Sequence, residues 1–141
     1  TENKIEYVNA GHTDVLVKTP SKKDSISVLG GNTDSFRGSF IGIEGLPDDY
    51  RTVTQELTGE TYLLLYTDCL TESRNLAGDE LGIDRLKEIF ARTPSGSAKE
   101  VLAFLFDIFE AFTEAVPLRD DLTVIVMKYS GNGSGQIHAK N

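Results

Sequence analysis

Two apolar segments constrain the fold of this chain most, because each has the length and residue types of a buried strand and each adjoins an acidic motif. Residues 61–66 (Thr-Tyr-Leu-Leu-Leu-Tyr) are followed closely by Asp68. Residues 122–127 (Leu-Thr-Val-Ile-Val-Met) are preceded closely by Asp120. A strand end holds its side chain rigidly, and hard divalent cations need oxygen ligands gathered from different elements. The sequence therefore predicts that a folded sheet brings these carboxylates together at a metal-binding edge.

Further strands are expected in the first half of the chain, where β-branched and apolar residues alternate with polar ones. The predicted strands cover residues 4–8, 15–17, 26–29, 50–57, 61–66 and 122–127. Gly59 and its neighbours lie between the fourth and fifth of these strands, and the pattern predicts a tight hairpin there.

Helical spacing replaces strand alternation in the second half of the chain. Residues 84–90 predict a short helix. Ser97 is an expected N-cap, and Glu100 has the spacing that completes a capping box. A longer helix with a wide apolar stripe follows, and Pro117 is expected to end it.

These elements predict an α+β fold in which helices flank an antiparallel β-sandwich. We expect residues 1–129 to form part of a domain. Residues 130–141 are expected to be a flexible tail, because residues 131–135 are Gly-Asn-Gly-Ser-Gly. The chain of 141 residues begins with Thr1, shortly before the first expected strand, so we expect it to be a piece of a larger domain.

The charge balance and the cysteine content exclude several classes of protein. A formal net charge of −8 and a pI near 4.7, without a basic cluster, argue against a surface that binds nucleic-acid phosphates. A single cysteine, Cys69, excludes an internal disulfide and fits a reducing, cytoplasmic compartment. No apolar run is long enough to span a bilayer, so we expect no membrane contact by this segment.

Five short motifs follow one another along the chain. They are Asn-Ala-Gly-His at 9–12, Ser-Phe-Ile-Gly-Ile at 39–43, Tyr-Thr-Asp-Cys-Leu-Thr-Glu at 66–72, Leu-Gly-Ile-Asp-Arg-Leu at 81–86 and Asp-Asp-Leu-Thr-Val at 120–124. In this order they resemble the metal-dependent protein phosphatases, the PPM family, and within it the SpoIIE-like bacterial serine phosphatases. Each motif is weak by itself, but their order is specific. The resemblance covers about residues 5–129 and corresponds to the C-terminal half of the catalytic domain.

The resemblance implies a β-sandwich whose edge holds a binuclear Mn²⁺ or Mg²⁺ centre. Enzymes of that family hydrolyse phosphoserine or phosphothreonine with a metal-activated water and form no phosphoenzyme, which two neighbouring cations make feasible. By motif match, Asp68 and Asp120 would be ligands of one metal ion, and Asp121 would lie outside that ligand set. His12 is a candidate phosphate contact, although an imidazole can also cap the turn in which it lies.

The partner implied by the resemblance is a phosphoprotein substrate, such as an anti-sigma-factor antagonist. The alternative is a noncatalytic interaction module that has kept the sandwich. The family's upstream D-x-x-G-H-G segment, which supplies the bridging aspartate, has no counterpart in these residues. We therefore expect this segment alone to be inactive, to bind metal weakly and to associate with itself through uncovered sheet surface.

Cys69 is a second departure, because the family nearly always has glycine at this position. If the backbone there had a positive φ, a cysteine would strain the turn. The thiol could reach the metal site or serve as a small buried apolar side chain. Arg74 and Arg119 are the cations nearest to the acidic motifs, and each could bind phosphate bidentately or pair with a neighbouring acid.

Overall fold

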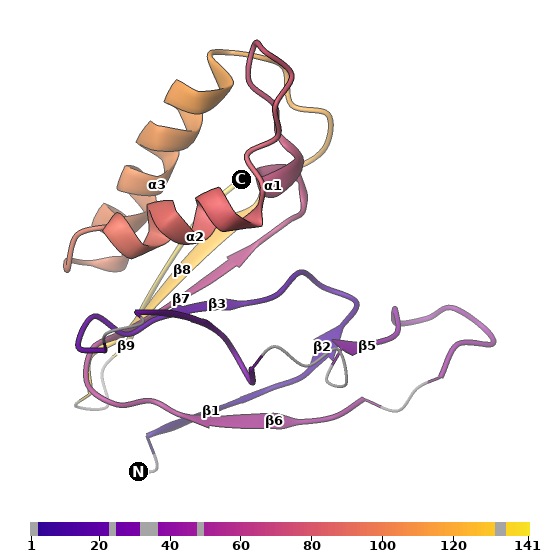
Figure 1. The fold of residues 1–141 in the computed structure, drawn as a ribbon. Coiled ribbons are helices and arrows are strands. Elements are labelled where there is room, and N and C mark those ends of the chain that lie inside the picture. The colour runs from indigo at the N-terminus through magenta and orange to yellow at the C-terminus, as the bar shows by residue number, and fades with distance from the viewer. Residues whose placement is uncertain (1–2, 23–24, 32–36, 48–49, 132–134) are drawn as a thin grey trace.

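The computed structural model describes residues 3–22, 25–31, 37–47, 50–131 and 135–141, and it has the α+β architecture expected from the sequence. Its elements in chain order are β1 (Lys4–Tyr7), β2 (Asn9–Ala10), β3 (Leu16–Lys18), β4 (Ile26–Val28), β5 (Arg37–Gly38), β6 (Val53–Glu56), β7 (Thr61–Tyr66), α1 (Cys69–Glu72), α2 (Ile83–Arg92), α3 (Ala98–Thr113), β8 (Val124–Tyr129) and β9 (Gly135–Lys140). In Figure 1 the helices lie on one side of the larger sheet and the β1–β6 pair lies on the other side.

The larger sheet has five strands in the order β4-β3-β7-β8-β9, and all neighbouring strands are antiparallel. β7 lies at its centre, so protein covers both of its faces. Tyr62 and Leu64 belong to the core on the helix side, whereas Leu63 belongs to the core on the opposite side. The central position explains the nearly continuous apolar sequence of β7, because a strand covered on both faces needs no polar alternation.

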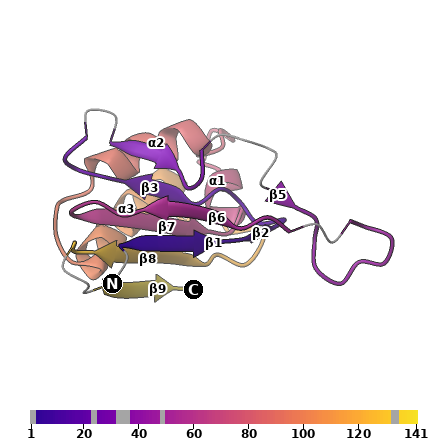
Figure 2. The ribbon, with the colours of Figure 1, turned by 90° about the horizontal axis from the view of Figure 1, so that it is seen from below.

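Two apolar cores make the structure a sandwich with helices on its outer face. The larger core fills the space between the sheet and the helices and includes Leu64 and Phe90. The smaller core includes Val17 and Leu63 from the larger sheet, and Ile5 of β1 packs against it. Figure 2, seen from below, shows β1 and β6 laid over the larger sheet. The expected antiparallel sandwich flanked by helices is therefore confirmed.

The two long helices begin and pack as their apolar spacing predicts. α2 buries Leu86, Ile89 and Phe90 against the core. α3 begins with the predicted capping box, in which the Ser97 side chain accepts from the Glu100 N–H and the Glu100 carboxylate accepts from the Ser97 N–H. Within the described ranges, neither helix has the combination of length and apolar character needed to cross a membrane.

The end of α3 comes earlier than the sequence predicts. Pro117 is not what stops the helix, because the last helical residue is Thr113. Glu114 and Ala115 follow with φ values of 48° and 66°, in the left-handed region. The Glu114 N–H still donates to the carbonyl oxygen of Glu110, which closes the last turn. The reversed backbone then redirects the chain before the proline is reached.

The turn around Gly59 does not form the predicted hairpin. β6 pairs with β1, whereas β7 pairs with β3 and β8. Residues 57–60 therefore carry the chain from the smaller sheet to the larger one. The prediction was wrong because a short glycine turn also permits a corner between packed sheets, and the sequence of the turn does not specify which partner a strand takes.

Residues 135–140, expected to belong to a flexible tail, form β9 instead. This strand pairs with β8 along its whole length, from Val124↔Lys140 to Tyr129↔Gly135. All six of its residues are exposed, so no apolar pattern marked it as a strand. The open edge of β8 offers unpaired backbone groups that any returning segment can bond. The flexible-tail prediction is wrong for these residues, and residues 132–134 lie outside the described part of the chain.

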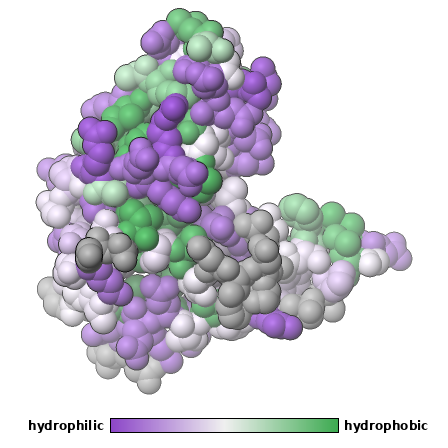
Figure 3. Space-filling view, in the orientation of Figure 1, coloured by the Kyte–Doolittle hydropathy of each residue, from purple (hydrophilic) through white to green (hydrophobic). Residues whose placement is uncertain are grey.

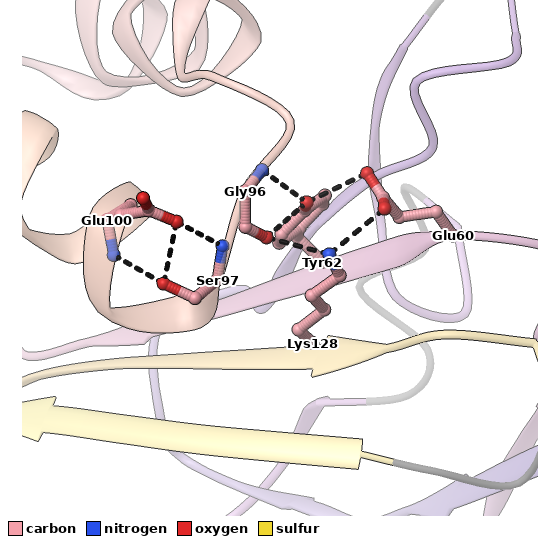
Figure 4. Close-up of polar contacts among 6 residues, drawn as sticks. All are labelled: Glu60, Tyr62, Gly96, Ser97, Glu100 and Lys128. Atoms are coloured by element: carbon pink, nitrogen blue, oxygen red, sulfur yellow. Dashed lines mark hydrogen bonds and ion pairs between the residues drawn. The ribbon is translucent and has the colours of Figure 1, made fainter.

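A polar network of four residues, here called the Tyr62 anchor, fixes the loop between α2 and α3 to the sheet (Figure 4). The Tyr62 hydroxyl donates to Glu60 Oε1 (2.8 Å) and accepts from the Gly96 N–H (3.0 Å). Lys128 Nζ donates to the Gly96 carbonyl oxygen (2.7 Å) and lies 3.0 Å from Glu60 Oε2. Hydrogen bonds from Tyr62 and Lys128 lower the pKa of the Glu60 carboxyl. The anchor therefore combines burial of an aromatic ring with a charged cluster at its polar end.

One surface segment projects beyond the sandwich. This segment, residues 39–47, is called the apolar arm and follows β5 (Figure 1). Phe40, Ile41 and Ile43 in it are 60%, 77% and 53% exposed. Figure 3 shows the apolar surface on this projection, apart from the main body of the molecule. Large exposed apolar side chains in one segment mark a surface suited to contact with another apolar surface.

Candidate metal site

The ends of β7 and β8 bring the two acidic motifs to the same edge of the sheet. The strands are antiparallel, and Tyr66 at the end of β7 pairs with Val124 at the start of β8. The pairing continues beyond the strands, because the Thr67 N–H donates to the Thr123 carbonyl oxygen at 3.0 Å. The motifs that contain the two predicted metal ligands therefore emerge side by side.

Two side chains bond across the space between the motifs. The Thr67 hydroxyl donates to the Asp121 carbonyl oxygen at 2.9 Å and accepts from the Thr123 N–H at 3.0 Å. The Cys69 thiol donates to the Asp120 carbonyl oxygen at 3.3 Å. These bonds fix the backbone of one motif relative to the other, which a shared ion would require.

Both predicted ligands are exposed, and each has one carboxylate oxygen held by a backbone N–H. Asp68 caps α1, where its Oδ1 accepts from the Cys69 N–H at 2.9 Å. Asp120 Oδ1 accepts from the Asp121 N–H at 2.7 Å. A carboxylate has acceptor capacity for more than one bond, so each aspartate retains oxygen lone pairs for a cation. Coordination of one metal ion by the carboxylates of Asp68 and Asp120 stays a prediction.

The donor set fits part of a site for a hard cation. Mn²⁺ and Mg²⁺ prefer oxygen ligands, and two carboxylates are what this edge of the sheet supplies. Within residues 3–22, 25–31, 37–47, 50–131 and 135–141, no group of three or more His, Cys, Asp or Glu side chains gathers around one position. The residues therefore fit two ligand positions, and a full coordination shell needs further oxygens from water or other protein segments.

The Asn-Ala-Gly-His motif at 9–12 closes a turn. The buried Asn9 side chain donates from Nδ2 to the His12 carbonyl oxygen at 3.0 Å, and its Oδ1 accepts from the His12 N–H at 2.7 Å. Gly11 has a φ of 79°, and a Cβ atom there would lie 2.6 Å from Cδ1 of Phe40. The motif thus needs Asn9 for the two hydrogen bonds that close the turn. It needs Gly11 because the backbone has a positive φ and because a larger residue would collide with the Phe40 ring.

His12, the candidate phosphate contact, is exposed near the end of β7. Its Nδ1 lies 3.0 Å from the Thr13 carbonyl oxygen and 3.2 Å from Thr13 Oγ1. The Thr13 hydroxyl donates to the Tyr66 carbonyl oxygen, so the turn is bonded to the strand end that leads to Asp68. The structure therefore ties the histidine turn to the acidic motif, and the phosphate contact itself stays a prediction.

Cys69 does not strain the backbone. It is the first residue of α1, a short helix that begins directly after Asp68. Among the described residues, only Glu114 and Ala115 combine a side chain with a positive φ. The thiol is 5% exposed and donates to Asp120, so it is a packed hydrogen-bond donor between the two motifs.

A groove of about 290 Å³ lies beside the Asp120 motif. Its walls come from α1, from Arg74 and Glu80 in the following loop, and from residues 116–120 after α3. The sequence did not predict this groove, because its walls are distant in sequence and meet only when the sandwich is folded. The one available signal was the presence of Arg74 and Arg119 close to the acidic motifs.

Comparisons with known proteins find relatives for this chain. A family profile described as Stage II sporulation protein E (SpoIIE) matches residues 1–130. A manganese-presoaked structure of the phosphatase domain of the cell fate determinant SpoIIE from Bacillus subtilis has a TM-score of 0.66 and 17% identity, and the match covers 94% of this chain and 53% of that chain. A second structure of that domain has a TM-score of 0.58 and 18% identity, with 93% and 53% covered. This chain thus spans about half the length of that domain. No curated protein matches it.

Proposed function

The chain belongs to the SpoIIE family, and from that membership we propose that the protein is a metal-dependent phosphatase acting on phosphoserine or phosphothreonine of a regulatory phosphoprotein. The observation that carries the proposal is the convergence of the Asp68 and Asp120 motifs at one edge of the sheet, where Thr67 and Cys69 bond across the space between them. The fold shared with the manganese-presoaked phosphatase domain supports it.

We assign Asp68 and Asp120 as ligands of one divalent cation, Mn²⁺ or Mg²⁺, in a centre that is binuclear in the complete domain. The chemistry supplied by such cations is Lewis acidity, which lowers the pKa of a water and neutralises charge on phosphoryl oxygens. The part of this chain is to hold the carboxylates in place. The N–H groups of Cys69 and Asp121 fix one oxygen of each, so little reorganisation is needed when a cation binds.

The surface around the two aspartates suits a phosphorylated side chain presented by another protein. Both carboxylates are exposed, so a phosphoserine on a folded partner can reach them without entering an enclosed cavity. His12 would contact the phosphate from the turn bonded to the end of β7. The family resemblance favours a small regulatory phosphoprotein, such as an anti-sigma-factor antagonist, as that partner.

The test is Mn²⁺-dependent hydrolysis of a phosphoserine peptide by the full-length protein. Asp68→Asn and Asp120→Asn keep the shape of the side chain and remove the charge that binds a cation. Each should lower activity by more than the roughly 10- to 100-fold loss that follows removal of an outer partner of a metal ligand. Asp107→Asn, on an exposed position of α3, is the matched control and should keep full activity.

Two results would contradict the proposal. Activity retained in Asp68→Asn removes Asp68 from the mechanism. Activity unchanged by chelation and by added Mn²⁺ removes the metal altogether.

A noncatalytic interaction module is the second candidate. It is favoured by the absence of any group of three metal-binding side chains within the described ranges. Such a module would bind its phosphoprotein partner with equal affinity in the presence and absence of Mn²⁺ and would leave the phosphate intact. Measuring partner binding and phosphate release in the same samples distinguishes the two candidates.

A further inference from the structure

The groove beside Asp120 contains two arginines, and the structure distinguishes between them. Arg74 is committed to its own loop, because its Nη2 donates to Glu80 Oε1 and its Nη1 donates to the Gly78 carbonyl oxygen at 3.2 Å. The backbones of Arg74 and Glu80 also form an antiparallel bridge. The guanidinium of Arg74 therefore closes the loop after α1, and both of its Nη atoms donate inside that loop.

Arg119 has no comparable partner. Its side chain is exposed and lines the groove, and within the described ranges it makes no hydrogen bond, ion pair or ring contact. Among the described residues the neighbouring Asp120 forms no ion pair with it, and Asp120 Oδ1 accepts from the Asp121 N–H at 2.7 Å. The N–H donors of the planar Arg119 guanidinium are thus available to a ligand in the groove.

The negative charge around the groove makes the Arg119 guanidinium important for binding a phosphate there. Glu72, Glu80 and Asp120 also line the groove, and the chain carries a formal net charge of −8. A phosphate approaching this edge meets carboxylates within one Debye length, about 8 Å at physiological ionic strength. A guanidinium at the rim offsets that repulsion and offers two parallel N–H···O bonds that match the geometry of a phosphate.

We propose that Arg119 binds the phosphate group of the substrate and thereby selects phosphorylated over unphosphorylated segments. This inference rests on the proposed function, because Asp120 is the assigned metal ligand and its Cα lies about 3.8 Å from that of Arg119. Both residues line the same groove, so a phosphate bound at that cation would share the groove with the Arg119 guanidinium. The occupant of the groove is an extended phosphoserine or phosphothreonine segment, whose flanking residues pack on Val116 and Leu118 in the groove wall.

The experiment compares Arg119→Gln with Arg74→Gln in the full-length protein, using Mn²⁺-supported hydrolysis of a phosphoserine peptide and of p-nitrophenyl phosphate. Loss of a charged hydrogen bond corresponds to about 10- to 100-fold in affinity. Arg119→Gln should raise KM on both substrates by that factor and raise the inhibition constant of inorganic phosphate equally. Arg119→Lys should recover part of the loss, because it keeps the charge without the fork. Arg74→Gln should leave KM within about twofold, since its partners lie inside the loop.

Three outcomes would overturn the inference. The first is an unchanged KM in Arg119→Gln, and the second is an equal loss in Arg74→Gln. The third is a loss confined to the peptide with an unchanged inhibition constant for phosphate, which would show that Arg119 contacts the peptide and not its phosphate.

If the wild-type protein shows no Mn²⁺-dependent hydrolysis, the proposed function fails separately. Binding of labelled phosphorylated and unphosphorylated peptides then tests the inference alone. The wild type should prefer the phosphorylated form, and Arg119→Gln should abolish that preference. An equal preference in both proteins would refute the inference.

Discussion

At the scale of single residues, Cys69 shows how a departure from a family pattern is accommodated. The first turn of α1 gives this position a helical backbone, so no glycine is needed there. The buried thiol then donates to the carbonyl oxygen of Asp120. The side chain therefore takes part in holding the two acidic motifs together, a role that glycine could not perform.

Replacing Cys69 by Ala should destabilise the protein by about 1 kcal/mol, because it removes one hydrogen bond and leaves the Asp120 carbonyl without that donor. Chemical denaturation of the full-length protein measures this difference, and titration with Mn²⁺ measures the accompanying loss of metal affinity. Cys69→Ser is the matched control, since a hydroxyl can donate in the same direction. Equal stability and metal affinity in all three proteins would show that the thiol only fills space.

The sequence predicted that the two aspartate motifs meet, but it did not predict their surroundings. Asp68 lies two residues after the end of β7 and Asp120 lies four residues before the start of β8, so position along the sequence predicted that both motifs would reach one edge. The helical conformation of Cys69 and its bond to Asp120 depend on a contact between segments distant in sequence. The groove that contains Arg119 depends on the same long-range packing. Such contacts have no local signal in composition or spacing.

At the scale of elements, the Tyr62 anchor explains how the helical layer keeps its position on the sheet. The Tyr62 hydroxyl bonds both Glu60, in the turn before β7, and Gly96 in the α2–α3 loop. Nearby, the buried Lys18 donates from Nζ to the carbonyl oxygen and to Oγ1 (2.8 Å) of Thr93 in the same loop. Burial lowers the pKa of Lys18, although Glu60 acts in the opposite direction. With Lys128 of β8, which donates to the Gly96 carbonyl oxygen, the loop is thus fixed from three strands of the sheet.

Tyr62→Phe should lower the free energy of unfolding by about 1–2 kcal/mol at neutral pH, because the Gly96 N–H and Glu60 each lose a partner. The hydrogen bond from Tyr62 is the largest cause of the lowered Glu60 pKa. A carboxyl with a lowered folded-state pKa stabilises the fold above its ordinary pKa, and that contribution is lost as the pH falls through the folded-state value. The destabilisation by Tyr62→Phe should therefore shrink in acid.

Urea denaturation of the wild type and of Tyr62→Phe, at neutral pH and in acid, measures how the destabilisation changes with pH. Tyr129→Phe is the matched control, because the Tyr129 hydroxyl is buried without a hydrogen-bond partner in the described part of the chain. Removing that hydroxyl should leave stability unchanged or slightly increased at every pH. A destabilisation by Tyr62→Phe that is independent of pH would contradict the assigned role of Glu60.

The elements themselves were predictable to different degrees for physical reasons. α2, α3 and β7 carry strong periodicity or a continuous apolar run, and the sequence predicted each of them. β9 is a fully exposed edge strand whose formation depends on the open edge of β8. The corner after β6 uses the same glycine turn that a hairpin would use, so only the packing of the two sheets decides between them.

At the scale of the whole molecule, the distribution of apolar surface is uneven. The sandwich buries its two cores, whereas the apolar arm exposes Phe40, Ile41 and Ile43 in one projecting segment. Leu76 is also largely exposed (72%), but it lies alone at the turn between Asn75 and Gly78. Single exposed apolar residues are ordinary on protein surfaces, whereas clusters of them mark contact sites.

We therefore expect the chain to form concentration-dependent oligomers, and we place the contact on the apolar arm instead of the uncovered sheet surface expected from the sequence. Ile41→Asp should shift the population toward monomer, because a charge at the contact would have to be desolvated on association. Leu76→Asp makes the same chemical change outside the arm and should leave the oligomer distribution as in the wild type. Sedimentation velocity over a range of concentrations distinguishes these outcomes. A wild-type chain that stays monomeric at high concentration, or an equal response to both substitutions, would mean that the arm does not drive association. In the second case, the association would have to use another surface of the chain.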